Sequence, residues 1–242
     1  MSEAASRILE SLGAVQAERR ARRESPGLAE AVAALKAYQQ ARFGRTHADL
    51  LAHPRYGPAA RFFLAELYGP QDFAQRDAEF ARIVPALARL FPADLVDTVQ
   101  ALAEVHALSE RLDTAMARHL DGAEPDRAAY VRAWQRTGEP EARERQVCLV
   151  MRVGRSLDRH TRSLLLGASL KAMRGPARAA GLGTLQAFLE AGFAAFGTMR
   201  GADEFLGVIE RRESALASRL FEPGAQDAAR APAADDPLAQ LP

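Results

Sequence analysis

Histidine and carboxylate side chains on one predicted helix are the first candidates for chemistry. His106, Glu110 and Asp113 are spaced by four and three residues, which places them on one helical face. A carboxylate-bridged di-iron bundle requires Glu-x-x-His on two helices, and no histidine here follows a glutamate at that spacing. We therefore predict no metal site and interpret this face as a hydrogen-bonded surface stripe. A haem ligand among His106, His119 and His160 stays an open alternative.

Common catalytic motifs are missing from the sequence. It contains no phosphate-binding glycine loop, nucleophile elbow or zinc-protease signature. The single Cys148 excludes every metal framework built on cysteine pairs. We predict neither a catalytic residue nor a cofactor. Catalytic triads are assembled in space, so an enzyme of unknown class stays an alternative.

A basic helical face is the strongest signal for a binding partner. Arg152, Arg155, Arg159 and Arg162 follow at steps of three, four and three, and three further basic residues come soon after: Lys171, Arg174 and Arg178. Residues 152–178 hold seven basic side chains and one acidic side chain, although the whole chain carries only +1. Such asymmetry favours an acidic protein partner or a phosphorylated ligand. The alternative is a solvated face, or one paired with acidic helices of the same chain.

Two other features bear on partners. The near-neutral total charge argues against a nucleic-acid binder, which usually needs a strongly basic domain. A second basic run, 19–23, lies at a predicted helix C-terminus, where the helix dipole favours cations. We therefore assign that run no partner. A homodimer stays an open alternative.

The predicted helix over 184–199 is apolar on nearly every side. Phe188, Gly192, Phe196 and Met199 lie on it, and such a helix is expected at the centre of a bundle. Glycine weakens a helix interior by about 1 kcal/mol, so Gly192 indicates a close approach of another group. That group is either a neighbouring helix or a flat or acyl ligand. The set is therefore a candidate ligand site as well as a candidate core.

A short aromatic segment is the most distinctive sequence in the chain. It reads Phe-Phe-Leu-Ala-Glu-Leu-Tyr-Gly-Pro-Gln-Asp-Phe over 62–73, followed by Arg76-Asp77. It resembles a bacterial family known by its FFLEELY motif, with alanine at the fourth position. The resemblance covers about 45–221 and implies no activity or catalytic residues. Read physically, the segment is a structural corner with an ion network of Arg61, Glu66, Arg76 and Asp77. The alternative is a polar site beside an aromatic wall, where Tyr68, Arg76 and Asp77 contact a ligand.

Periodicity predicts an all-α bundle without strands. Apolar residues recur at steps of three and four, and alanine, leucine, glutamate and arginine fill most segments. We expect about nine or ten helices, over the ranges 3–22, 27–52, 58–68, 72–91, 94–120, 126–137, 140–160, 163–173, 184–199 and 203–221. We expect one domain over 1–222, with a sub-bundle boundary near 122–125 as the alternative. The Ala/Pro/Asp-rich segment 223–242 is predicted to be a disordered tail.

The remaining signals concern compartment. One free thiol, no secretory signal and no apolar stretch of membrane-spanning length predict a cytoplasmic protein without a membrane span. The leading interpretation is a non-catalytic binding or interaction protein that uses the basic 152–178 face. A helical bundle that binds an apolar, acyl or haem-like ligand is the first alternative.

Overall fold

The computed structural model describes residues 2–66, 71, 73–120 and 125–242, and these residues form helices and no strand. The all-α prediction is confirmed. The helices are α1 (Glu3–Glu24), α2 (Leu28–Thr46), α3 (Ala48–Ala52), α4 (Gly57–Glu66), α5 (Ala74–Leu90), α6 (Ala93–Ala117), α7 (Arg127–Thr137), α8 (Pro140–Thr161), α9 (Leu164–Ala172), α10 (Arg174–Ala179), α11 (Gly183–Gly197), α12 (Asp203–Phe221), α13 (Ala225–Ala228) and a 3₁₀-helix η1 (Pro237–Gln240).

The described residues contain thirteen α-helices, more than the nine or ten expected. The expected 27–52 helix is divided at His47, whose backbone has φ −118° and ψ 26°. The helices α10 and α13 are additional. Pro176 lies in the first turn of α10, where a missing N–H breaks no intrahelical hydrogen bond. Gly175 and Pro176 therefore lie within the first turn of a helix.

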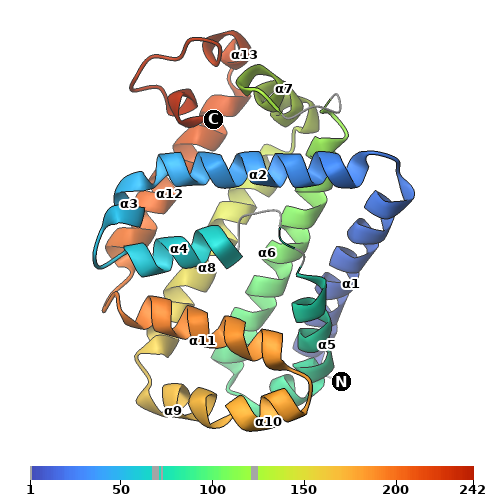
Figure 1. Cartoon of the computed structure of the whole chain (residues 1–242), viewed down its shortest axis with the longest axis vertical. Helices are drawn as coiled ribbons and strands as arrows, with labels where there is room; N and C mark the ends of the chain where they lie inside the picture. Colours follow the sequence, from blue (N-terminus) through green and yellow to red (C-terminus); the bar gives the residue numbers. More distant parts are fainter. Residues whose placement is uncertain (1, 67–70, 72, 121–124) are drawn as a thin grey trace.

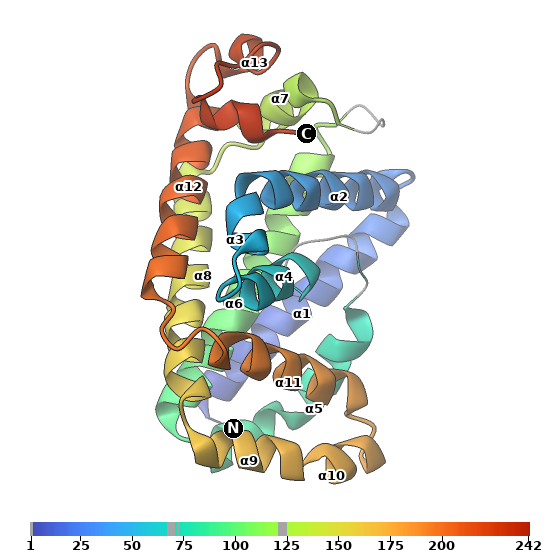
Figure 2. The same cartoon turned by 60° about the vertical axis from the view of Figure 1, so that its left-hand side comes forward.

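Two long helices, α6 and α8, pack together along the length of the molecule (Figures 1 and 2). The helix α1 packs on α6, and α12 packs on α8. Across this frame lie α2 and α4, then α11, while α9 and α10 cover one end (Figure 1). The C-terminal end of α8, with its basic face, therefore lies at the end of the molecule that α9 and α10 cover.

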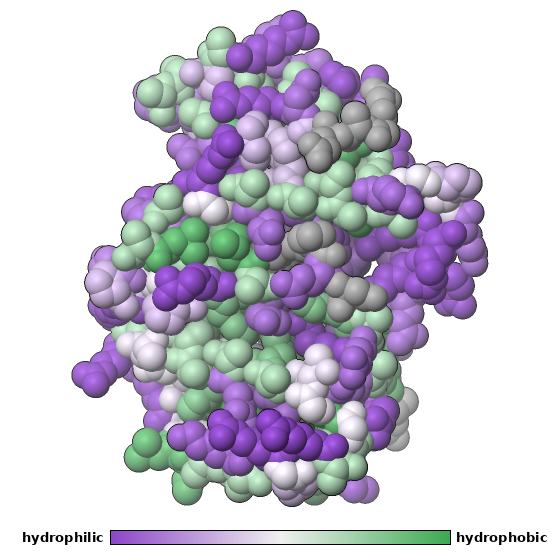
Figure 3. Space-filling view, viewed as in Figure 1, coloured by the Kyte–Doolittle hydropathy of each residue, from purple (hydrophilic) through white to green (hydrophobic). Residues whose placement is uncertain are grey.

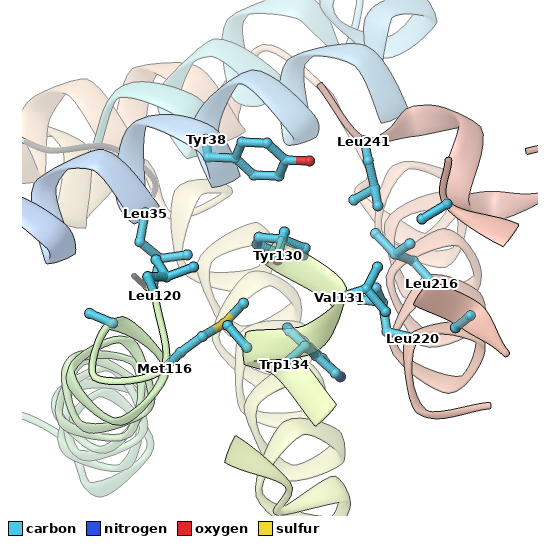
Figure 4. Close-up of a cluster of buried hydrophobic side chains, with 14 of the residues drawn as sticks. Leu35, Tyr38, Met116, Leu120, Tyr130, Val131, Trp134, Leu216, Leu220 and Leu241 are labelled. Carbon is cyan, nitrogen blue, oxygen red and sulfur yellow. The ribbon is translucent and has the colours of Figure 1, made fainter. Parts of the chain in front are cut away.

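The C-terminal segment is packed against the bundle, contrary to the disorder that its composition predicts. Leu238 and Leu241 have no exposed surface and belong to a core cluster of α2, α6, α7 and α12. Figure 4 shows Leu241 directed into this cluster near Val131 and Leu216. The few apolar residues of the tail are enough to anchor it, because two buried leucines contribute several kcal/mol together, at about 1.5–3 kcal/mol each.

The expected boundary near 122–125 falls almost wholly outside the described residues, so the single-domain division over 1–222 stays a prediction. Among the helices that the structure describes, none has both the length and the apolar composition to cross a bilayer.

Candidate docking surface at the α9–α10 end

Arg152, Arg155 and Arg159 of α8, with Arg162 at its C-terminal cap, point to solvent because the opposite face of this helix is apolar. Leu149 and Val153 are buried on the side that packs against α6. One or two residues away along the helix, the side chains Arg152, Arg155, Arg159 and Arg162 are all exposed. The predicted basic face therefore exists as a continuous strip along α8.

Part of this charge is already compensated within the chain. Arg155 Nη2 lies 3.1 Å from Glu210 Oε2, and Arg162 Nη2 lies 2.5 Å from Asp158 Oδ2. Arg159 donates a hydrogen bond to Ser156 Oγ at 3.1 Å. For Arg152, no ion pair is found among the described residues. The alternative of intramolecular pairing is thus true for some of the arginines and not for the whole strip.

The helix α9 continues the strip and has no buried residue. Ser163 caps it by accepting a hydrogen bond from the Leu166 backbone N–H at 3.2 Å. The next two side chains are apolar and open to solvent: Leu164 is 90% exposed and Leu165 82% exposed. Figure 3 shows hydrophobic residues at the lower corner where Figure 1 places α9, beside a hydrophilic band. This is an unusual place for two consecutive leucines.

Basic residues border these leucines on the side of α10. Arg174 is bound by Glu190 of α11, with Nε 2.7 Å from Oε1, and hydrogen bonds from Arg174 and Gln186 lower the pKa of Glu190 to about 2. Lys171 and Arg178 are exposed and have no ion pair within the described part of the chain. Met173, between them, is 51% exposed.

The segment from α8 to α10 combines exposed positive charge with exposed apolar side chains. We call it the docking surface; it consists of Arg152, Arg155, Arg159, Arg162, Leu164, Leu165, Lys171, Met173, Arg174 and Arg178. From 159 to 189 the sequence contains no aspartate or glutamate. An exposed apolar patch rimmed by charges is typical of an interaction site. The charges of this surface follow from the sequence, whereas the exposed Leu164 and Leu165 do not, because a short apolar run does not show whether it is exposed.

Phe188 and Phe196 of α11 are packed against phenylalanines of α4. Phe196 and Met199 are fully buried, and Phe188 packs on Phe62 with ring centroids 5.6 Å apart. A Cβ added at Gly192 would stand 3.0 Å from Phe62 Cζ. The close approach that Gly192 indicated is therefore made by a protein side chain.

The polar corner of the FFLAELY segment is only partly described. Tyr68 lies outside the described residues. Arg76 is sandwiched between two rings, with its Cζ 3.9 Å from the Phe73 centroid and 4.4 Å from the Phe188 centroid. Its Nη1 is 3.4 Å from Glu66 Oε2. The structure thus joins Arg76 and Phe188, two candidates that come from separate segments, in one packed cluster.

Asp77 belongs to a buried ionic network between α1, α5 and α6. Its Oδ2 lies 2.8 Å from Arg19 Nη2 and 2.9 Å from His106 Nε2. Burial raises the pKa of Asp77, but His106, Arg19 and Arg76 outweigh this effect and lower it. Asp77 is therefore an ionised structural group that is 4% exposed.

Glu110 continues the network on the next turn of α6. Arg22 Nη1 lies 2.5 Å from Glu110 Oε2, and Lys36 Nζ lies 2.5 Å from Oε1. One turn further, Asp113 Oδ1 accepts a hydrogen bond from Gln39 at 3.3 Å. The face of His106, Glu110 and Asp113 is thus a buried stripe, and the expectation of a surface stripe is wrong.

The run 19–23 contributes to this network rather than serving only the helix dipole. Arg19 and Arg22, three residues apart, face inward, whereas Arg20 and Arg23 are exposed. The spacing of three residues between Arg19 and Arg22 is the sequence signal that could have predicted this inward-facing pair. In the described ranges, no group of three or more His, Cys, Asp or Glu side chains is arranged to hold a metal ion.

A comparison with family models places the chain. The model described as a domain of unknown function, DUF8198, matches residues 18–227. The chain belongs to the DUF8198 family. No curated protein and no solved structure matches it.

The DUF8198 match includes every residue of the docking surface and of the buried network around Glu110. It ends before Leu238 and Leu241. The anchoring leucines of the C-terminal segment therefore lie outside the matched region of this DUF8198 chain. The resemblance to the FFLEELY family stays a prediction.

Proposed function

We propose that this DUF8198 protein is a cytoplasmic, non-catalytic binding protein that docks an anionic partner on the docking surface. The observation that carries the proposal is the pair Leu164 and Leu165, at 90% and 82% exposure, on a positively charged helix with no buried residue. Each leucine is worth about 1.5–3 kcal/mol when moved out of water. A partner that covers them gains this energy.

The free cations of the surface supply attraction and orientation. Arg155, Arg162 and Arg174 are occupied by carboxylates of the same chain, so they contribute less than their number implies. Lys171 and Arg178 are exposed without an ion pair among the described residues. Charges of this kind accelerate association and make it sensitive to salt.

The ligand-bundle alternative draws less support from the packing. Phe62 fills the space beside Gly192, and Phe196 and Met199 have no exposed surface. An apolar or acyl ligand at this place would have to displace core side chains.

The test compares two charge reversals of equal size. Lys171→Glu with Arg178→Glu changes the docking surface, while Arg20→Glu with Arg23→Glu changes two exposed arginines of α1. Binding is measured by titration against two anionic probes, a polyglutamate peptide and phosphatidylglycerol-containing vesicles. We expect the docking-surface variant alone to bind at least one probe about tenfold more weakly, with unchanged circular dichroism, because each basic residue near an anionic surface is worth about 1 kcal/mol.

Equal loss in the two variants, or no loss in either, would contradict the proposal. In the first case the attraction depends only on net charge. In the second case the docking surface does not take part in binding.

A further inference from the structure

We propose that the anionic partner is a phospholipid membrane surface, with Leu164 and Leu165 inserted among the lipids and the neighbouring basic residues at the headgroup phosphates. This inference rests on the proposed function and names its partner. Insertion of this kind places a helix in the interface without crossing the bilayer.

The two leucines project from the molecule rather than lining a groove. The helix α9 packs against α11: Gln186 Nε2 donates to the Leu170 carbonyl at 2.7 Å, and the Phe193 ring packs at Gly167. Leu164 and Leu165 lie at the N-terminal end of α9, before both of these contacts, and remain open to solvent. Projecting apolar side chains suit a fluid partner, because lipids rearrange around them without a preformed pocket.

Charge complementarity points to an anionic membrane. Arg162 comes two residues before Leu164, and Lys171, Arg174 and Arg178 follow within the next fourteen. No acidic residue lies between 159 and 189. Long basic side chains keep their charge at the headgroups while their methylene stems cover apolar surface.

A cavity beside the leucines offers space for a headgroup. It measures about 280 Å³ and lies between the end of α8 and the end of α11. It is lined by Asp158, Thr161, Arg162, Phe196, Gly197 and Arg200, and Arg162 is paired with Asp158. Arg200, for which no ion pair is found among the described residues, supplies the guanidinium that is suited to phosphate oxygens, which it binds through paired N–H donors.

The position of the surface permits end-on contact. The helices α9 and α10 lie at one end of the elongated molecule, and the C-terminus lies toward the other end (Figures 1 and 2). A membrane at the α9–α10 end therefore leaves α2, α7 and α12 accessible from solution.

A second copy of the chain is a poorer occupant. In a two-fold dimer the same patch faces itself, so the unpaired cations of one copy would meet those of the other. Like charges at close range oppose such pairing. An acidic protein meets the charge requirement, yet it would need a pocket shaped for the two leucines.

The experiment uses the full chain and sedimentation with vesicles. One set contains phosphatidylcholine alone and the other contains phosphatidylcholine with phosphatidylglycerol. We expect binding to the anionic set only, weakened by salt. Leu164→Ser with Leu165→Ser should weaken it about tenfold or more, because each CH₂ removed from the lipid is worth about 0.8 kcal/mol. The fold should persist, since both side chains are exposed.

A second measurement reports insertion directly. Leu164→Trp places an indole at the expected depth, and brominated lipids quench a fluorophore that enters the acyl region. Trp134, the single tryptophan of the chain, is buried and provides the unquenched background. We expect quenching in the variant and none in the wild-type chain.

The outcomes separate the two proposals. The protein could bind polyglutamate but not anionic vesicles, and lose this binding in the Lys171→Glu, Arg178→Glu variant. That result would overturn the membrane proposal and retain an anionic protein partner. Self-association lost on Leu164→Ser with Leu165→Ser, without vesicle binding, would overturn it in favour of a second copy. Vesicle binding without quenching at position 164 also overturns insertion. Failure of both anionic probes overturns both proposals.

Discussion

Arg22 of α1 and Glu110 of α6, 88 residues apart in sequence, form an ion pair of 2.5 Å between buried side chains. The same guanidinium donates to the Glu110 carbonyl at 2.6 Å and to Thr114 Oγ1 at 2.8 Å. Lys36 of α2 binds the other carboxylate oxygen. Glu110 thus links α1, α2 and α6 through its contacts with Arg22 and Lys36.

Neutralising Glu110 should strongly destabilise the fold. Glu110→Gln leaves Arg22 and Lys36 buried without a countercharge, and breaking a buried pair costs about 3–5 kcal/mol. Urea denaturation at neutral pH measures the loss. The matched control is Glu104→Gln, at the more exposed pair with Arg145, where we expect at most about 1 kcal/mol. A similar loss in both variants would contradict the role of burial.

Stability should fall in acid through two buried glutamates. Burial raises the pKa of Glu110, but Lys36 and Arg22 outweigh burial and lower this pKa to about 2. In the same way, Arg42 and His47 outweigh the burial of Glu213 and lower its pKa to about 2. Both folded-state values lie below the ordinary 4.5, so the stabilisation is complete above pH 4.5 and is lost as the pH falls toward 2. Denaturation at a series of pH values should show this slope. Glu110→Gln should flatten it, and an unchanged slope would contradict the assignment.

Asp113 should have the opposite pH dependence. Burial raises its pKa despite Lys36 and Arg143, so the folded state holds the proton more tightly than the unfolded state. Its contribution to stability is present at low pH and is lost as the pH rises through the folded-state pKa. We expect Asp113→Asn to gain stability relative to wild type as the pH increases through this range. A difference between the two proteins that does not vary with pH would refute the raised pKa.

A side chain at position 192 should not be tolerated. Gly192→Leu forces a Cβ to 3.0 Å from Phe62 Cζ and overfills the core, at a cost of about 1–3 kcal/mol. Gly13→Leu is the matched control on α1, because nothing lies within 4 Å of a Cβ there. We expect the control to stabilise the protein by about 0.5–1 kcal/mol through helix propensity. Thermal unfolding of both variants gives the comparison, and equal effects would show that the space at 192 is open.

The C-terminal segment should contribute to global stability. Leu241→Ala removes a fully buried side chain and should cost about 2–5 kcal/mol. Asp235→Ala, at an exposed position of the same segment, should change stability by less than about 0.5 kcal/mol. Guanidinium denaturation monitored by Trp134 fluorescence is suitable, since Trp134 lies in the same core cluster. A silent Leu241→Ala would indicate the disordered tail that the composition predicts.

Local patterns in the sequence determined the helical class and most helix positions. The 3–22 prediction corresponds to α1, 140–160 to α8 and 203–221 to α12. The reason is physical: helix periodicity and end signals act over a few residues. The basic strip of α8 was predicted for the same reason, because spacing along one helix determines which side chains share a face.

Only the tertiary structure decided which other segments each helix face contacts. Glu110 is buried because Arg22 and Lys36 arrive from other helices, and Gly192 is filled by Phe62 of α4. Leu164 and Leu165 are exposed because α9 lies at the end of the bundle with nothing described beyond it. Burial and charge compensation depend on contacts between distant segments, and such contacts leave no periodic signal in a single sequence.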